Sequence, residues 1–281
     1  MINIIANKYI FLTISGLLVL AAVAAIITFG LKQGIDFTGG AQWQISTSTG
    51  FDQLQKLYPE ATIISQTRSD NFIIRAKEIN RELAKDITLE ELSYEEIGPA
   101  IGSELRRKAI WAFVGVLLAI SLYIAFAFRK VSQPVSSWKY GLITLVTLFH
   151  DALIPVGLWA YLGQVQNLEV SANLVVAILV VMGFSVHDTI VVFDRIRENL
   201  RTDQQLKSDF NNIVNQSVNQ TLGRSLNTSL TLILVLLTLL FFGPANLTYF
   251  VLTILVGVVV GTYSSIFVAS PLLTLWRRTA A

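Results

Sequence analysis

Long apolar runs alternate with short polar segments along most of the chain, and one polar stretch is far longer than the rest. A helix needs about 20 apolar residues to cross a bilayer. The long polar stretch divides the chain into a first membrane helix within residues 1–31, a folded polar domain at 32–106 and a five-helix membrane domain at 107–281. The pattern predicts six membrane-spanning helices, at residues 10–29, 109–128, 140–162, 170–193, 226–242 and 247–275.

Within the polar domain, the pattern changes to short segments that are typical of a small α+β fold. Alternating and β-branched segments predict strands at 41–46, 61–67 and 71–77. Segments 51–58 and 80–92 predict helices, and a last strand is expected before the second span. This order of strand, helix, strand, strand, helix, strand is the split βαβ of a ferredoxin-like sandwich. A domain of about 70 residues has a thin core, so we expect it to lean on a partner.

A further segment, residues 206–222, has an apolar stripe in place of a continuous apolar run. This spacing predicts a helix with one apolar face, which lies at the cytoplasmic surface or packs against neighbouring spans. It is therefore not counted among the six spans. Its apolar residues recur every four positions, at Leu206, Phe210, Val214, Val218 and Leu222.

The distribution of basic residues predicts the orientation of the chain. Lys and Arg gather in alternate loops, and such loops are cytoplasmic by the positive-inside rule. Both termini are therefore expected in the cytoplasm and residues 32–106 outside it. The cluster Arg106-Arg107-Lys108 lies on the other side, which the rule permits after a long translocated domain. The basic residues that set the orientation are Lys8, Arg129, Lys130, Lys139, Arg195, Arg197, Arg201, Lys207, Arg277 and Arg278.

Composition excludes several kinds of chemistry. The chain has no cysteine, so disulfides, thiolate catalysis and zinc–thiolate sites are ruled out. A net charge of +2 without a basic stripe argues against nucleic acid as a partner. Residues 22–24 have the small-x-small form of a signal-peptide cleavage site, but the apolar run continues to Phe29. That continuation favours an uncleaved membrane anchor.

Both histidines of the chain precede an aspartate inside a predicted span, as His150-Asp151 and His187-Asp188. A carboxylate in hydrocarbon costs several kcal/mol unless it is paired, neutralised or hydrated, so these residues are candidate functional groups. Neighbouring side chains on a helix point about 100° apart, which disfavours one metal ion on either pair. A proton or ion relay is the favoured hypothesis, with a metal site and a structural polar contact as alternatives.

Depth in the membrane helps to distinguish these alternatives. Counting from Arg195 places Asp188 about 10 Å inside the membrane, and counting from Lys139 places Asp151 about 18 Å inside. Staggered carboxylates favour a proton path over the level dyad of an aspartyl intramembrane protease. Arg224 opens the fifth span, where it is either the basic partner of Asp188 or a topological anchor.

The remaining polar residues near these spans have simpler interpretations. Asp194 and Arg195 are expected at a solvated helix end with local ion pairs. Gly257 and Gly261 form a G-x-x-x-G motif that allows close helix packing, and the hydroxyl residues after it are assigned to packing as well. The string G-I-D-F-T-G-G at residues 34–40 permits tight turns but lacks the signature of a phosphate loop. The sequence shows no pattern that pairs a nucleophile with a general base, so the chain is not predicted to be an enzyme.

Four strings together resemble the SecF family of bacterial protein export. They are G-I-D-F-T-G-G after the first span, I-G-P-A-I-G-S-E-L-R-R-K-A-I before the second, F-H-D in the third and V-H-D-T-I-V-V-F-D-R-I-R-E-N in the fourth. The resemblance runs from about residue 34 to residue 271, in motif order. It implies half of a resistance-nodulation-division type bundle, with six spans and an extracytoplasmic ferredoxin-like domain.

The resemblance also implies a function and its residues. It implies an accessory subunit in the bacterial inner membrane that uses the proton gradient, with a SecD-like chain and the SecYEG channel, to move preproteins outward. Protons are the expected coupling ion, with sodium as the alternative, and no cofactor is expected. A resistance-nodulation-division type small-molecule or lipid transporter half is the alternative function. The proton pathway falls on Asp188, Arg224 and Asp151, with His187, His150, Asp194 and Arg195 in support.

Overall fold

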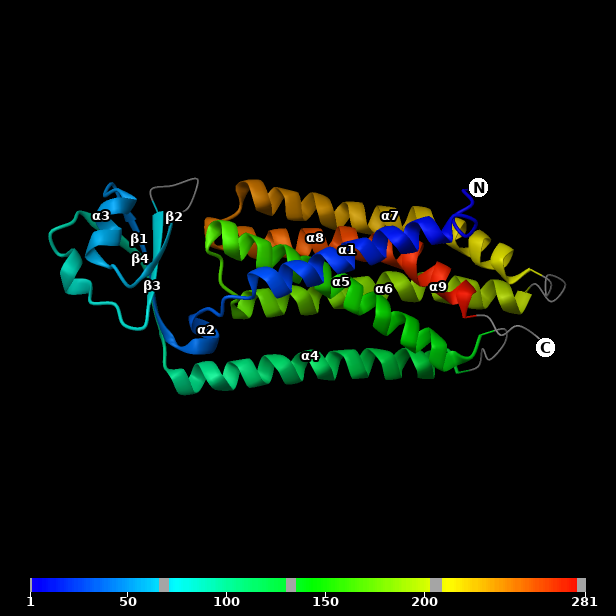
Figure 1. Cartoon of the computed structure of the whole chain (residues 1–281). Coiled ribbons are helices and arrows are strands. Elements are labelled where there is room, and N and C mark those ends of the chain that lie inside the picture. Colours follow the sequence, from blue (N-terminus) through cyan, green and yellow to red (C-terminus); the bar gives the residue numbers. More distant parts are fainter. Residues whose placement is uncertain (1, 66–70, 130–134, 203–208, 277–281) are drawn as a thin grey trace. The chain divides into compact units, whose positions relative to one another are not determined.

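The computed structural model describes residues 2–65, 71–129, 135–202 and 209–276 (Figure 1). The chain divides into two compact units, and each is described by itself. One unit holds Met1–Thr28, Phe113–Leu158 and Val176–Ala281, and the other holds Phe29–Ala112 and Trp159–Val175. Predicted features that lie outside the described residues are Lys130, Leu206, Lys207, Arg277, Arg278 and the last two positions of the strand expected at 61–67.

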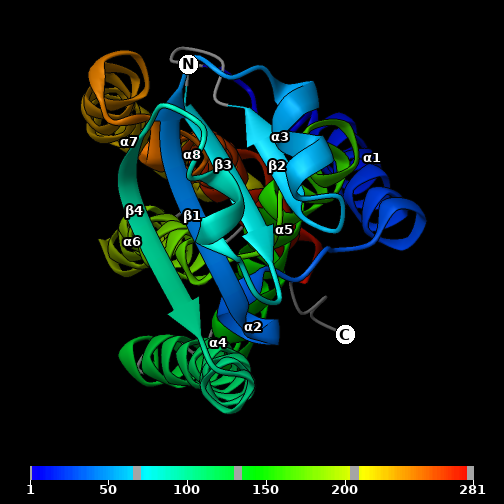
Figure 2. The ribbon, with the colours of Figure 1, turned by 90° about the vertical axis from the view of Figure 1, so that its left-hand side faces the viewer.

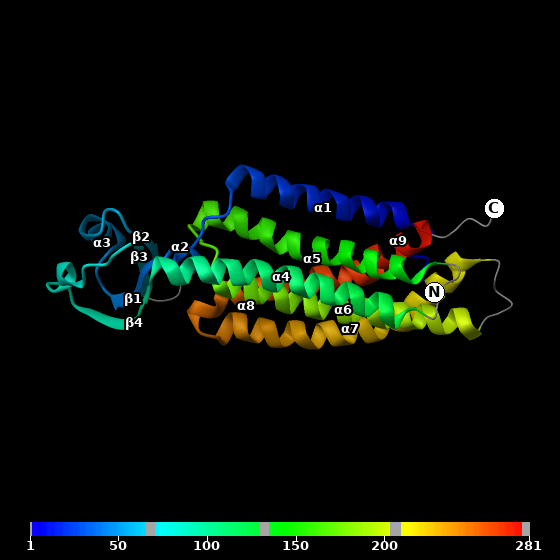
Figure 3. The same ribbon diagram turned by 90° about the horizontal axis from the view of Figure 1, so that it is seen from below.

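Six segments of the described chain are helical, long and apolar enough to cross a membrane, which confirms the predicted number (Figure 3). The third, fourth and sixth spans are the most buried, whereas the first, second and fifth expose most of their apolar residues. Two of the buried spans, the third and the fourth, carry the buried aspartates Asp151 and Asp188. The six spans are α1 (Lys8–Phe29), α4 (Pro99–Ala127), α5 (Ser137–Gln166), α6 (Ala172–Thr202), α7 (Phe210–Phe242) and Thr248–Leu275.

The last span is not a uniform α-helix. It consists of α8 (Thr248–Ser264), a π-helical turn η3 (Ser265–Ala269) and α9 (Ser270–Leu275). Pro271 has no N–H group to donate, and in a regular α-helix its ring would clash with the carbonyl of the preceding turn. A π-helical turn before the proline is one way to relieve this clash. Such turns are often found at functional sites in helices.

The predicted separate helix at 206–222 is wrong in one respect. Its described part belongs to α7, which runs without a break from Phe210 through the fifth span. The apolar stripe is buried as expected, because Phe210, Val214 and Val218 pack in one cluster with Ile4 and residues of α6. Asp209 accepts a hydrogen bond from the Asn211 N–H and starts the helix. Tertiary packing on this stripe therefore extends the fifth span by several turns.

The start of the first span and the end of the last span lie at the same end of their unit. The Lys8 ammonium donates to the Thr274 hydroxyl at 3.4 Å, and the Lys139 ammonium donates to the Trp276 carbonyl at 2.9 Å. Both contacts join basic residues at span ends to the end of α9. An even number of crossings explains this arrangement.

The G-x-x-x-G motif brings α8 against α6 at close range. A Cβ added at Gly261 would lie 3.0 Å from the Ser185 Cβ, and one added at Gly257 would overlap the Val181 side chain. Small residues allow this approach because no side chain keeps the two helices apart. The motif thus sets the distance at which polar groups of α6 and α8 meet.

The second unit contains a four-stranded antiparallel sheet (Figure 2). The strand order is β2-β3-β1-β4, which is the order of a split βαβ sandwich. Its core includes Trp43, Ile45, Leu54 and Ile74. The elements are α2 (Ile35–Thr38), β1 (Gly40–Thr47), α3 (Phe51–Leu57), β2 (Thr62–Ser65), β3 (Asn71–Ala76), η1 (Arg81–Ala84) and β4 (Leu89–Ile97).

The second helix predicted for this domain, at 80–92, is wrong. Only a 3-10 turn, η1, forms there, and β4 already begins at Leu89. Leu and Glu favour a helix locally, but pairing with β1 overrides that preference. The acidic side chains of β4 are exposed, which is usual for the edge strand of a sheet. The sheet order therefore agrees with the sandwich, while one of its two helices is reduced to a turn.

Candidate functional site

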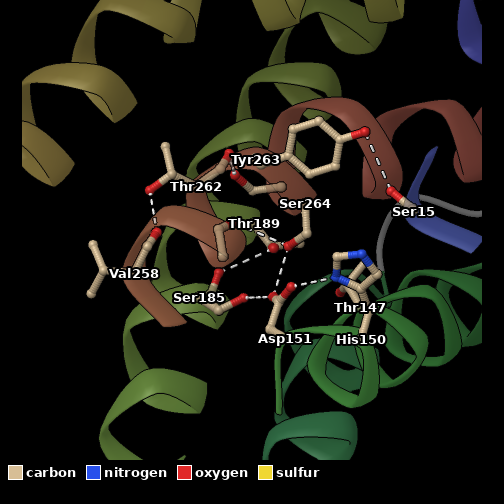
Figure 4. Close-up of polar contacts among 12 residues, drawn as sticks. Ser15, Thr147, His150, Asp151, Ser185, Thr189, Val258, Thr262, Tyr263 and Ser264 are labelled. Atoms are coloured by element: carbon tan, nitrogen blue, oxygen red, sulfur yellow. Dashed lines mark hydrogen bonds and ion pairs between the residues drawn. The ribbon is translucent and has the colours of Figure 1, made fainter. Parts of the chain in front are cut away.

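Asp151 on α5 is fully buried and has partners on both carboxylate oxygens (Figure 4). Its Oδ2 accepts a hydrogen bond of 2.7 Å from the Ser264 hydroxyl and a second one from the Ser185 hydroxyl. Its Oδ1 lies 2.8 Å from Nδ1 of His150. Three side chains from three helices therefore converge on this carboxylate. A buried acid is tolerated when its oxygens are hydrogen-bonded in this way.

Asp188 on α6 is 4% exposed and has fewer partners. Its Oδ2 accepts a hydrogen bond of 2.7 Å from the Ser265 hydroxyl. Within the described part of the chain, this is its one side-chain hydrogen bond. The same Ser265 hydroxyl lies 3.0 Å from the Thr262 carbonyl, so it can donate to either oxygen. Asp188 is thus the less constrained of the two carboxylates.

Two adjacent serines connect the carboxylates through the last span. Ser264 ends α8 and reaches Asp151, and Ser265 opens the π-helical turn and reaches Asp188. Neighbouring helical residues point about 100° apart, so consecutive side chains can face α5 and α6. Ser185, which also binds Asp151, precedes Asp188 by one turn, or about 4.5 Å. The depth offset is therefore smaller than the roughly 8 Å expected from loop positions.

The two histidines occupy different environments. His150 is 5% exposed, and within the described residues its Nε2 has no hydrogen-bond partner. Its Nδ1 reaches the neighbouring Asp151, although adjacent side chains were expected to diverge. His187 is exposed on α6. Among the described residues, no three His, Asp or Glu side chains gather as metal ligands would.

Arg224 does not meet Asp188 in this structure. Its side chain is exposed on α7 and forms no ion pair with any residue that the structure describes. The next residue, Ser225, is buried, and one turn further the Ser229 hydroxyl lies 2.6 Å from that of Thr262. The face of α7 that meets α8 is therefore lined with hydroxyl groups.

Asp194 and Arg195 lie at the polar end of α6, as predicted. Arg197 pairs with Asp194 at 2.8 Å, and Arg195 pairs with Glu198 at 2.6 Å. Arg195 also donates to the Gln220 side chain on α7 at 2.6 Å. These are local ion pairs of a helix end, and they do not contact either buried aspartate.

Sequence reasoning missed the serines of the site. The sequence pattern predicts a packing role for Ser264 and Ser265 and no role for Ser185. All three are buried and donate to a carboxylate. The signal in the sequence is a hydroxyl residue at membrane depth on a span that packs against a span with an aspartate. Pairing these residues requires the packing of α5, α6 and α8, which the sequence pattern does not specify.

The fold and the site define a multi-pass membrane protein with two hydrogen-bonded carboxylates inside its helix bundle. Residues 75–279 match the family described as "Protein export membrane protein SecD/SecF, C-terminal", and residues 24–50 match the "SecD/SecF GG Motif". The protein translocase subunit SecF of Thermobaculum terrenum is 41% identical, over 99% of this chain and 95% of its own. SecF of Endomicrobium trichonymphae is 36% identical, over 98% and 91%. The chain belongs to the SecD/SecF family, among its SecF subunits.

A solved structure agrees with this assignment. The crystal structure of SecDF, a translocon-associated membrane protein from Thermus thermophilus, has a TM-score of 0.85 and 33% identity. The alignment covers 98% of this chain but 38% of the SecDF chain. The chain is thus an accessory subunit of Sec protein export, with a SecD partner. This role takes the place of the small-molecule or lipid transporter half that the sequence left open.

Proposed function

We propose that this subunit uses the proton gradient to promote the outward movement of preproteins at the SecYEG channel, together with its SecD partner. Asp188 is the group that takes up and releases the proton. The observation that carries the proposal is a buried acid in a span with a single hydroxyl partner. Such a carboxylate is costly to keep charged in the membrane and marks an ion pathway by default.

The chemistry of the partner suits a group that changes its charge. A serine hydroxyl can donate to a carboxylate and can also accept from a carboxylic acid, whereas a backbone N–H can only donate. Ser265 can therefore remain hydrogen-bonded to Asp188 in both protonation states. Asp151, with partners on both oxygens, is the more firmly held second carboxylate of the pathway. His150 supports it through Nδ1.

We propose that Arg224 is the partner of Asp188 in a second conformation of the bundle. It is exposed on α7, one residue before a buried serine. A rotation or shift of α7 would exchange these two positions, and a guanidinium near Asp188 would favour its charged form. His187, Asp194 and Arg195 are placed on the same helix as Asp188 and are assigned supporting roles.

The proposed setting is the inner membrane of a bacterium. Both termini face the cytoplasm and residues 32–106 lie outside it. The contacts of Lys8 and Lys139 with the end of α9 support a common side for both ends. The chain is proposed to act as a transporter subunit and not as an enzyme, with protons and no cofactor.

Replacing Asp188 tests the proposal. Asp188→Asn keeps the size of the side chain and a partner for Ser265 but cannot carry a proton. We expect gradient-stimulated export in membrane vesicles to fall at least about tenfold, with subunit levels and SecD association unchanged. Asp209→Asn, at the start of α7, keeps a side-chain oxygen that can cap the helix, so it is the matched control and should export normally. Wild-type export by Asp188→Asn under a proton gradient would refute the role of Asp188.

A further inference from the structure

The segment after the first span runs beside the loop that joins α5 to α6. The Val170 N–H donates to the Lys32 carbonyl at 2.7 Å, and the Gly34 N–H donates to the Val170 carbonyl at 2.9 Å. Between these bonds, Gln33 and Val170 form a parallel β-bridge. A Cβ at Gly34 would lie 3.0 Å from the Val170 oxygen, so glycine allows the two backbones to approach.

Asp36 completes this contact at the beginning of α6. Its Oδ2 accepts a hydrogen bond of 2.7 Å from the N–H of Ala172, the first residue of the helix. The first N–H groups of a helix lack partners within it, and a negative charge there also interacts favourably with the helix dipole. Beside it, the Lys32 ammonium donates to the Asn167 side chain at 3.0 Å.

An ion pair joins the same loop to the sheet. Arg75 of β3 pairs with Glu169 at 3.3 Å, and both side chains are largely buried, at 18% and 15% exposure. Arg75 also donates to Gln42 of β1 at 2.6 Å. Burial raises the pKa of Glu169, and the charges of Arg75 and Lys32 oppose that shift while Asp36 adds to it. The α5–α6 loop is therefore held by residues 32–36, which precede β1, and by the sheet.

This loop has a special place in the chain. It connects α5, which carries Asp151, to α6, which carries Asp188. Residues 159–175, at the tip of this helical hairpin, belong to the same compact unit as the sheet. From Ala172, α6 continues as one helix to Thr202. The two carboxylate-bearing spans are thus joined, at one end, by the segment that the polar domain holds.

We propose that Lys32, Gly34, Asp36, Arg75 and Glu169, here called the loop clamp, couple the polar domain to the α5–α6 hairpin. This assigns a mechanical role to the G-I-D-F-T-G-G string. The clamp makes the domain and the hairpin tip move as one body, so that events at Asp188 are transmitted to the domain through α6. The inference rests on the proposed proton role of Asp188 and names the residues that transmit a movement of α6 to the polar domain.

Uncoupling is the result that tests the clamp. In vesicles that carry the subunit with its SecD partner, both gradient-stimulated export and the Asp188-dependent part of proton flux are measured. Asp36→Ala removes the cap of α6, and we expect export to fall about tenfold while proton flux stays at the wild-type level. Asp36→Asn keeps a side-chain oxygen that can cap the helix and should export nearly normally. Lys85→Ala removes an exposed ion pair of the same domain and is the matched control.

A cross-link separates coupling from simple loss of stability. The chain has no cysteine, so Gln33→Cys and Val170→Cys would introduce the only pair. Neighbouring strands lie about 5 Å apart, which is within reach of a disulfide. When the pair is added to Asp36→Ala, oxidation should restore export and reduction should remove it again.

The outcomes distinguish failure of the clamp from failure of the proton proposal. Wild-type export by Asp36→Ala, or no recovery in the oxidised pair, would overturn the clamp. Equal loss of export and proton flux in Asp36→Ala would also overturn it, because a coupling residue should spare the flux. If the wild-type subunit shows no Asp188-dependent flux at all, the proton proposal fails first.

Discussion

The surroundings of Asp151 and Asp188 differ although both residues are buried aspartates that follow a histidine. Asp151 has three side-chain partners on two oxygens, and Asp188 has one. His150 is buried against Asp151, whereas His187, which precedes Asp188, is exposed. The difference agrees with the proposed division of roles, in which Asp151 holds three helices together and Asp188 is the proposed proton carrier. The same two-residue motif thus occurs in two different environments in one bundle.

Removal of each carboxylate should give the largest difference in stability between the two sites. Asp151→Ala leaves the Ser185 hydroxyl and a histidine nitrogen without their acceptor, while Ser264 retains the Gly261 carbonyl, and should lower the free energy of unfolding by about 3 kcal/mol. Asp188→Ala leaves one hydroxyl, which retains the Thr262 carbonyl, and should cost about 1 kcal/mol. Thermal unfolding of the two variants in the same detergent measures the difference. Equal destabilisation would contradict the structural role of Asp151.

The adjacent serines offer a sharper test on function. Ser265→Ala removes the single hydroxyl bound to Asp188 and should reduce gradient-stimulated export about tenfold. Ser264→Ala should have a smaller effect, because the Ser185 hydroxyl still donates to Asp151. Export in vesicles compares the two variants, and Ser265→Thr, which keeps a hydroxyl, serves as the control. The order of effects would be reversed if Asp151 were the titrating group.

The stability of the contact between α8 and α6 at Gly261 should change on addition of a single methyl group. Gly261→Ala places a Cβ 3.0 Å from the Ser185 Cβ, which separates α8 from α6 and should cost about 1–2 kcal/mol. Gly223→Ala on α7 meets nothing within 4 Å and should be neutral or slightly stabilising. Melting temperatures of both variants test the contrast. A neutral Gly261→Ala would show that the G-x-x-x-G contact does not set the helix distance.

The histidines should give the smallest effects. His150→Ala removes one partner of Asp151 and should lower stability by about 1 kcal/mol, because two serine donors remain. His187→Ala changes an exposed side chain and should leave stability at the wild-type level and lower export less than about twofold, because its role is a supporting one. The two variants are compared by thermal unfolding and export together. A larger effect of His187→Ala would place this residue in a contact with a partner chain.

Much of the fold could be predicted because it depends on local pattern. Apolar run length predicts spans, and α1 and α7 end within a few residues of their predicted limits. The strands β1 and β3 also lie where alternation predicted them. Prediction failed at η1 and β4, where pairing with β1 outweighs local helix preference. It also failed at the start of α7, where burial of an apolar stripe extends a span.

The sequence by itself determined the number of spans, the place of the polar domain and the two aspartates at membrane depth. These follow from hydrophobicity and from the cost of charge in a bilayer, which act residue by residue. Only the tertiary structure decided which groups meet those aspartates. Ser185, Ser264 and Ser265 come from helices far apart in the chain, and Arg224 stays away from Asp188. Such contacts depend on helix rotation and close packing at glycine, and a one-dimensional pattern contains neither.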